Sequence, residues 1–207
     1  MNRKIKIYCA GPLFNDKEKE EMFEIADVLE GKGFNVFLPH RDGLEFADLL
    51  GVFREKGVSE NSAQCLLNKA IFILDVYQVI DSDGLVLNIN GRVPDEGATV
   101  EAGIAWNAGK EVVIYKNDAR TLLSGNDNPL LLGLAGFDTV NKIYDIPAVF
   151  EKIFEDPSKS KKNKINSQRV KDLYKKGKYV SSLASKKRDR GVLCDEIINL
   201  LGGEKDV

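Results

Sequence analysis

Short apolar runs alternate with amphipathic segments along the first 150 residues, and this alternation limits the folds that are open to the chain. Strand-like composition occurs at five places, which are Ile5–Ala10, Phe34–Leu38, Ala70–Val76, Lys110–Tyr115 and Asp138–Val140. Helical spacing appears between them, as in Asp16–Glu30, where apolar residues share one side and acids the other. Strands that alternate with helices call for right-handed parallel crossovers. We therefore predict an α/β fold, a doubly wound five-stranded parallel sheet with helices on both faces.

The run Ala70–Val76 is the most apolar of the five. A strand that is apolar on both faces belongs in the centre of a parallel sheet. Asp75 interrupts this run at its carboxyl end, where open α/β sheets bind their ligands. A turn-initiating aspartate is the structural alternative. Because a carboxylate among apolar neighbours is costly, we interpret Asp75 as a functional residue.

Residues 90–106, NGRVPDEGATVEAGIAW, set two carboxylates around a glycine-marked turn into a helix. The spacing predicts that Asp95 lies on the loop and that Glu101 lies in the first turns of the helix over 98–109. The positive end of the helix dipole favours an ionised carboxylate there. An ionised glutamate can serve as a nucleophile. The alternative for Glu101 is a capping acid at the start of the helix.

The 207 residues are enough for one domain with an appended piece. We predict a catalytic domain over 1–155, followed by a basic linker and a C-terminal helical extension over 156–207. Residues 156–190 hold 13 Lys or Arg against 3 Asp, a local charge of +10 in a chain of net charge −2. The polar stretch 156–168 predicts a linker, and 192–201 an amphipathic helix. A solvated basic face is favoured over a nucleic-acid site, since no binding motif accompanies the lysines.

Several protein classes lack their signatures in this sequence. Three scattered cysteines form no CxxC pair, which fits reduced thiols in a cytoplasmic protein and predicts no metal site. No signal peptide or membrane span is evident. Phosphate-cradling GxxxxGK, dinucleotide-binding GxGxxG and nucleophile-elbow GxSxG motifs are missing, so no cofactor is expected. The single histidine, His40, is read as a turn or packing residue.

The predicted topology brings Tyr8 and three carboxylates, Asp75, Asp95 and Glu101, to the carboxyl edge of the sheet. Such a group suits cleavage of a glycosidic bond, in which one carboxylate attacks the anomeric carbon and an acid protonates the departing group.

These residues lie in a series of motifs within residues 5–150. The motifs are IYCAGPLF (7–14), LPHRDG (38–43), LD (74–75), DEGATVEAGIA (95–105), GKEVVIY (109–115) and DAR (118–120). In this order and spacing the chain resembles the nucleoside 2-deoxyribosyltransferase family. The resemblance implies a flavodoxin-like sheet, which agrees with the fold predicted above.

The resemblance also implies roles for the four residues. Glu101 matches the family's nucleophile, which displaces the base from C1′ of a 2′-deoxynucleoside to give a covalent deoxyribosyl ester, and a free nucleobase then attacks that ester. Tyr8 matches the residue that orients the nucleophile. Asp75 matches the acid near the base, and Asp95 matches the carboxylate that holds the 5′-hydroxyl.

Further contacts are implied in the same way. Phe14 would stack on the base, and Arg41 or Asp42 would read its edge. Asn128, with Leu130, matches a segment by which a neighbouring subunit completes the 5′ side, so a homo-oligomer with shared sites is expected. The basic extension and the long loop 79–91 depart from the family pattern.

Two other functions remain open. One is a hydrolase that cleaves deoxynucleoside 5′-monophosphates with the same glutamate. Such relatives hold phosphate with a Ser- and Arg-rich loop after the first strand, whereas this loop is GPLFND and carries an acid that repels phosphate. Arg41 and Arg92 are the residues that would offset this repulsion. The other is a non-catalytic nucleotide-binding module, which would not need Glu101.

Overall fold

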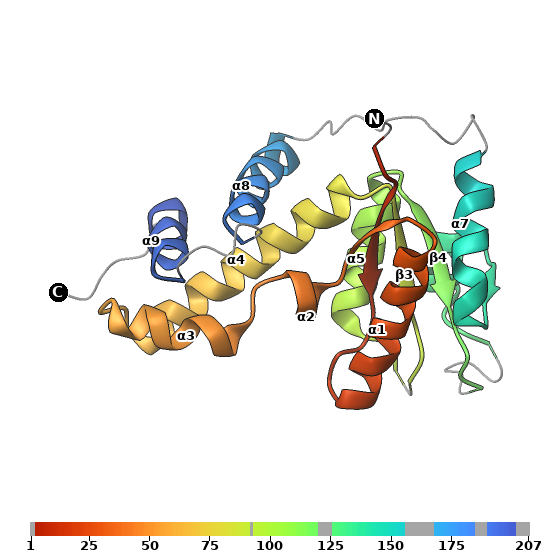
Figure 1. Cartoon of the computed structure of the whole chain (residues 1–207), viewed down its shortest axis with the longest axis horizontal. Helices are drawn as coiled ribbons and strands as arrows, with labels where there is room; N and C mark the ends of the chain where they lie inside the picture. Colours follow the sequence, from red (N-terminus) through yellow and green to blue (C-terminus); the bar gives the residue numbers. More distant parts are fainter. Residues whose placement is uncertain (1–2, 92, 120–125, 156–167, 185–189, 202–207) are drawn as a thin grey trace. The chain divides into compact units, whose positions relative to one another are not determined.

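The structure is a computed structural model that describes residues 3–91, 93–119, 126–155, 168–184 and 190–201 (Figure 1). Packing divides the chain into two compact units. Unit 1 comprises Met1–Leu38 and Val79–Ile165, and unit 2 comprises Pro39–Gln78 and Asn166–Val207. This division differs from the predicted boundary at residue 155, because residues 39–78 pack with the C-terminal helices. Arg92 and most of the predicted basic linker lie outside the described residues.

Unit 1 holds a five-stranded sheet in the order β2-β1-β3-β4-β5. The strands are β1 (Lys6–Ala10), β2 (Asn35–Phe37), β3 (Gly84–Asn88), β4 (Glu111–Tyr115) and β5 (Thr139–Val140). All four neighbouring pairs are parallel. This is the flavodoxin-like order, in which the chain reverses its direction of travel across the sheet between β1 and β3. The predicted fold class is confirmed.

Helices cover both faces of this sheet (Figure 1). One face packs against α1 (Asp16–Gly31) and α7 (Ile146–Glu155), and Ile7 and Cys9 point into that core. The other packs against α5 (Glu96–Asn107), and Tyr8 and Ala10 point into that second core. Because successive residues of a strand face opposite sides, β1 directs Tyr8 towards α5. Three short turns complete the unit, α6 (Pro129–Leu132), η1 (Gly133–Ala135) and η2 (Ile143–Asp145).

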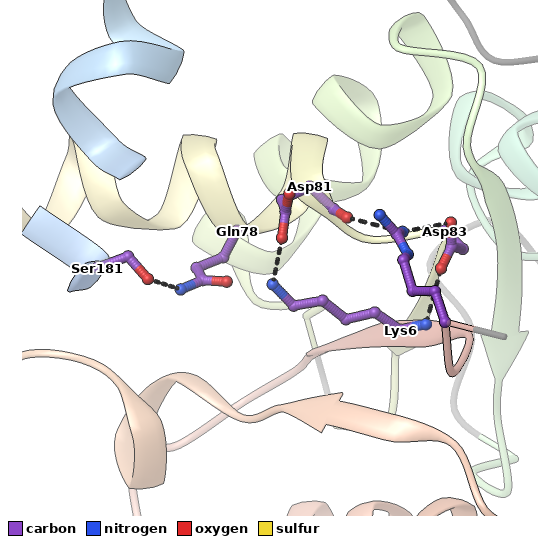
Figure 2. Close-up of polar contacts among 6 residues, drawn as sticks. Lys6, Gln78, Asp81, Asp83 and Ser181 are labelled. Carbon is purple, nitrogen blue, oxygen red and sulfur yellow. Dashed lines mark hydrogen bonds and ion pairs between the residues drawn. The ribbon is translucent and has the colours of Figure 1, made fainter. Parts of the chain in front are cut away.

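Ionic contacts tie the amino end of β1 to the segment before β3 (Figure 2). Lys6 Nζ lies 2.8 Å from Asp81 Oδ2, and the backbone N–H of Lys6 donates to Asp83 Oδ2 at 2.8 Å. Arg3 also donates to Asp83, at 2.7 Å. These bonds fix the register in which β1 and β3 pair, at the end of the sheet away from the loops that follow the strands.

Unit 2 is helical. It contains α2 (Pro39–Asp42), α3 (Phe46–Glu55), α4 (Glu60–Asp81), α8 (Gln168–Ala184) and α9 (Arg190–Leu201), with the last turn of α4 counted in unit 1. Its main core joins α3, α4 and α9 through buried residues that include Phe53, Leu67 and Ile197. The predicted helix over 192–201 is part of α9, so the C-terminal extension helps to build this core.

The prediction of a strand over Ala70–Val76 is wrong, because these residues continue α4 without a break. Apolar side chains lie on several sides of α4, and such a helix is indistinguishable in sequence from a strand buried on both faces. The third strand is β3, within the segment predicted to be a long loop. By length and composition α4 also resembles a helix that crosses a membrane, yet most of that stretch is buried inside the protein. Core packing therefore accounts for its hydropathy.

Candidate functional site

The central contact of the site joins β1 to α5. The hydroxyl of Tyr8 donates to Glu101 Oε1 at 2.6 Å. Tyr8 is fully buried and stacks on Phe37, with ring centroids 5.5 Å apart, so its phenol is held in one place. Glu101 is partly buried in the second turn of α5, beyond the first turn where the helix dipole acts most strongly. The hydrogen bond from Tyr8 holds one oxygen of this carboxylate.

Asp95 begins the same helix. Its side chain accepts a hydrogen bond from Ala98 N at 2.6 Å and so caps α5. The capping alternative considered for Glu101 thus applies to Asp95. Because Asp95 and Glu101 share one helix across less than two turns, the orientation of both carboxylates is set by α5.

Asp75 lies in α4 within unit 2, between buried Leu74 and Val76. Burial raises the pKa of its carboxyl from the ordinary 3.8 to about 7. A carboxyl with that pKa is present in both protonation states near neutral pH, which is the property that a general acid needs. The expectation that Asp75 ends a strand was wrong, and its side chain is partly buried beside buried apolar neighbours.

A second polar group that the sequence did not single out lies at the carboxyl ends of β3 and β4. Glu21 of α1 accepts hydrogen bonds from Asn88 Nδ2 at 2.7 Å and from Asn90 Nδ2 at 2.9 Å. Asn88 is fully buried, and its Oδ1 accepts from the backbone N–H of Asn90 at 2.9 Å. The side chain of Asn90 also accepts from Asn117 N at 2.8 Å. These bonds fix the loops that follow β3 and β4.

Tyr115 completes this group at the end of β4. Its hydroxyl donates to Glu21 Oε1 at 3.4 Å. Burial, and next the negative charge of Glu21, raise the pKa of Tyr115, so the phenol stays protonated as a donor. The turn after β1 approaches the same group closely, since a Cβ on Gly11 would lie 2.4 Å from Met22 Sδ and 2.9 Å from Asn88 Cβ. Only glycine fits this approach.

A cavity of about 470 Å³ opens beside these loops. Its lining comes from the segments after β1, β3 and β4 and from α1, and includes Pro12, Asn15, Glu21, Asn90, Asn117 and Asp118. Because β1 and β3 are the strands between which the chain reverses direction, this is the edge of the sheet where flavodoxin-like folds bind ligands. Tyr8 and Glu101 are not among the lining residues, and their side chains lie on the α5 face.

The remaining predicted residues differ in their surroundings. Phe14 follows β1 and is 78% exposed. Arg41 and Asp42 form an ion pair at 3.0 Å within α2 of unit 2. Asn128 caps α6 by accepting from Leu130 N at 3.0 Å, and Leu130 is 81% exposed. Exposure of Phe14 and Leu130 leaves both side chains accessible to a substrate or a second subunit.

Comparison with known proteins identifies the family. Residues 7–140 match the sequence model of a family described as Nucleoside 2-deoxyribosyltransferase. This chain belongs to the nucleoside 2-deoxyribosyltransferase family. The matched range runs from the second residue of β1 to the end of β5, and Tyr8, Asp75, Asp95 and Glu101 lie inside it. No curated protein sequence matches the chain.

Solved structures are similar to this deoxyribosyltransferase family member at low identity. A conserved protein from Enterococcus faecalis V583 is 20% identical, with a TM-score of 0.53, and the match covers 72% of this chain and 99% of that chain. A 2-deoxyribosyltransferase from Bacillus psychrosaccharolyticus is 20% identical over 69% of this chain and 90% of its own, with a TM-score of 0.49. The CMP N-glycosidase BcmB of Clostridium botulinum is 18% identical over 70% and 98%, with a TM-score of 0.41.

Membership of the deoxyribosyltransferase family establishes the chain as an enzyme whose family binds nucleosides and nucleobases.

Proposed function

We propose that the chain exchanges the nucleobase of 2′-deoxyribonucleosides through a covalent deoxyribosyl ester on Glu101. The observation that carries this proposal is the 2.6 Å hydrogen bond from Tyr8 to Glu101 Oε1. A buried, ring-stacked phenol that holds one carboxylate oxygen fixes the direction in which the other oxygen points. Fixed geometry of this kind is what nucleophilic attack on a sugar carbon requires.

In the first half-reaction, Glu101 attacks C1′ and the C1′–N bond to the base breaks. The electron pair of that bond goes to the base nitrogen, which takes a proton from Asp75. A pKa of about 7 supports this assignment, because the carboxyl is protonated in a large share of molecules at neutral pH. The products are a deoxyribosyl ester and a free base.

In the second half-reaction, a nitrogen of the incoming base attacks C1′ and the ester C–O bond breaks. Glu101 recovers its carboxylate, and the proton released by the incoming base returns to Asp75. Each half-reaction inverts C1′, so the exchange retains the β configuration. Hydrolysis results when water takes the place of the second base.

Substrate contacts belong to the same proposal. Asp95 would accept a hydrogen bond from the 5′-hydroxyl, Phe14 would stack on the base, and Arg41 or Asp42 would read its edge. Asn128 and Leu130 of a neighbouring subunit would complete the 5′ side. Asp16 at the start of α1 and Asp95, the proposed 5′ contact, are both acids and would repel a dianionic 5′-phosphate. An unphosphorylated substrate is therefore proposed.

Product analysis tests this function. The protein is incubated with a deoxynucleoside, with and without a second free base, and in parallel with the matching 5′-monophosphate. We expect a new nucleoside only when the second base is present. Free sugar in both cases would identify a hydrolase, and release of base only from the monophosphate would identify the 5′-monophosphate N-glycosidase. No reaction would favour a binding module.

Two variants on one helix assign the nucleophile. Glu101→Ala should abolish exchange and leave the fold intact, whereas Glu96→Ala removes an exposed acid from the first turn of α5 and should keep full activity. Undiminished exchange by Glu101→Ala would refute the assignment.

A further inference from the structure

The C-terminal extension has no place in the proposed chemistry, yet α8 packs against one specific part of α4. That part is the segment Ile73–Gln78, the two turns that carry Asp75. All residues of this contact belong to unit 2.

Apolar and aromatic contacts join the two helices. Val180 of α8 is fully buried in a cluster with Ile73 and Leu74. The rings of Tyr77 and Tyr174 lie 5.0 Å apart at an angle of 59°. The contact is both apolar and aromatic, and it runs along consecutive turns of α4.

A hydrogen bond and a glycine set how closely the helices approach. Gln78 Nε2 donates to Ser181 Oγ at 2.8 Å, and both side chains are visible in Figure 2. A Cβ on Gly177 would lie 2.1 Å from Ile73 O and 2.3 Å from Tyr77 Cβ. Backbone approach as close as this is possible only without a side chain at residue 177.

The contact leaves Asp75 on another side of α4. At 3.6 residues per turn, Ile73, Leu74, Tyr77 and Gln78 cover an arc of about 140°, and Asp75 falls outside it. The helix α4 cannot rotate or slide without losing its contacts with α8. The carboxyl of Asp75, on another face of α4, therefore keeps its direction.

We propose that α8 is a positioning element for Asp75, which would make the C-terminal extension part of the catalytic apparatus. This inference rests on the proposed function, because it assumes that Asp75 protonates the leaving base. Gly177 and Ser181 are then positioning residues that act through Asp75.

Gly177→Ala is the main test, with Lys178→Ala as its control. Lys178 is the exposed neighbour of Gly177 on α8, so its replacement leaves the contact unchanged. Each variant is assayed for kcat and KM on a deoxynucleoside and on p-nitrophenyl 2-deoxyriboside. The second substrate releases p-nitrophenolate, which departs without being protonated and so does not need the acid.

Since a well-placed general acid contributes about 100-fold or more, Gly177→Ala should lower kcat for the deoxynucleoside by about tenfold or more, with little change in its KM. The rate on p-nitrophenyl 2-deoxyriboside should stay close to that of the wild type, as should both rates of Lys178→Ala. Ser181→Ala removes one bond of the contact without adding volume, and it should show the same selective loss in smaller degree.

Equal loss on both substrates, in Gly177→Ala and in Ser181→Ala, would show that α8 serves the folded state alone and would overturn the inference. Wild-type rates on both substrates, in both variants, would overturn it as well. Failure of the proposed function is a separate result, seen in the wild type as the absence of any deoxyribosyl chemistry on either substrate.

Discussion

Replacing Asp75 with Asn should stabilise the protein and at the same time remove its activity on deoxynucleosides. The magnitude follows from the pKa of the carboxyl, which burial raises from 3.8 to about 7. At about 1.4 kcal/mol per pH unit, the folded state carries a penalty of roughly 4 kcal/mol above pH 7 for keeping this group. Asn has nearly the same shape and no charge, so the variant avoids the penalty.

The sign of the pH dependence follows from the direction of the pKa change. The carboxyl costs nothing below about pH 3.8, where it is protonated in both states. As the pH rises towards 7, the unfolded chain ionises and the folded chain does not, so the wild type loses stability. Above about pH 7 the folded carboxyl ionises too, and the loss reaches its limit.

Urea unfolding followed by far-UV circular dichroism measures this effect. The gain in unfolding free energy of Asp75→Asn over the wild type should be larger at pH 8 than at pH 5 by roughly 3 kcal/mol. Glu55→Gln is the matched control, since it removes an exposed carboxylate from α3 of the same unit. A gain that is the same at both pH values, or a loss of stability, would refute the reasoning from burial.

Three further predictions follow from the contacts of unit 1. Tyr8→Phe removes the hydrogen-bond donor to Glu101 but keeps the ring that stacks on Phe37. In steady-state assays kcat should therefore fall about 10- to 100-fold with the fold unchanged, and an unaltered kcat would contradict the role given to this bond. Asp95→Asn should raise KM for a 2′-deoxynucleoside and leave KM for its 2′,5′-dideoxy counterpart unaltered, and equal KM changes on both substrates would argue against the 5′ contact. Asp95→Ala also removes the cap of α5 and should lower the unfolding free energy by about 1 kcal/mol. Glu21→Ala leaves the amide of buried Asn88 without this acceptor and should lower the unfolding free energy by about 2 kcal/mol in urea titrations. A stability equal to that of the wild type would mean that other contacts hold the loops after β3 and β4.

The five-stranded parallel sheet could be predicted from the sequence to a large extent. Four strands and the helices α1 and α5 fall where apolar spacing placed them. The exception, Ala70–Val76, failed because a helix with apolar residues on several sides and a buried strand have the same composition. The strand β3 has only five residues. The turn-forming residues on either side, Ser82–Asp83 and Asn90–Gly91, made the whole segment resemble a loop.

The sequence predicted the strand that carries Tyr8 and the helix that carries Glu101. Tyr8 and Glu101 are 93 residues apart, and they meet because β1 directs Tyr8 towards the face covered by α5. Glu21 could not be found in this way, since it lies among the acids of α1 that read as a solvated face. The Asn-x-Asn-Gly sequence that begins at the last residue of β3 was the available signal for its partners Asn88 and Asn90.

The composition of the second unit was also beyond sequence reasoning. Residues 39–78 and 166–207 are far apart in the chain, and no motif links them. The helix α8 is rich in lysine, and its sequence does not indicate which few residues pack, among them Gly177 and Val180. A glycine in a helix is normally destabilising, so its presence at 177 becomes intelligible only from the close approach to α4.

Capture of the covalent intermediate tests the central claim most directly. The protein is mixed with a deoxynucleoside in the absence of a second base, quenched in acid and digested, and the peptides are analysed by mass spectrometry. The account predicts one deoxyribosyl group on the peptide that contains Glu101, lost again when a free base is added before the quench. Turnover without such an adduct, or an adduct on another residue, would contradict it.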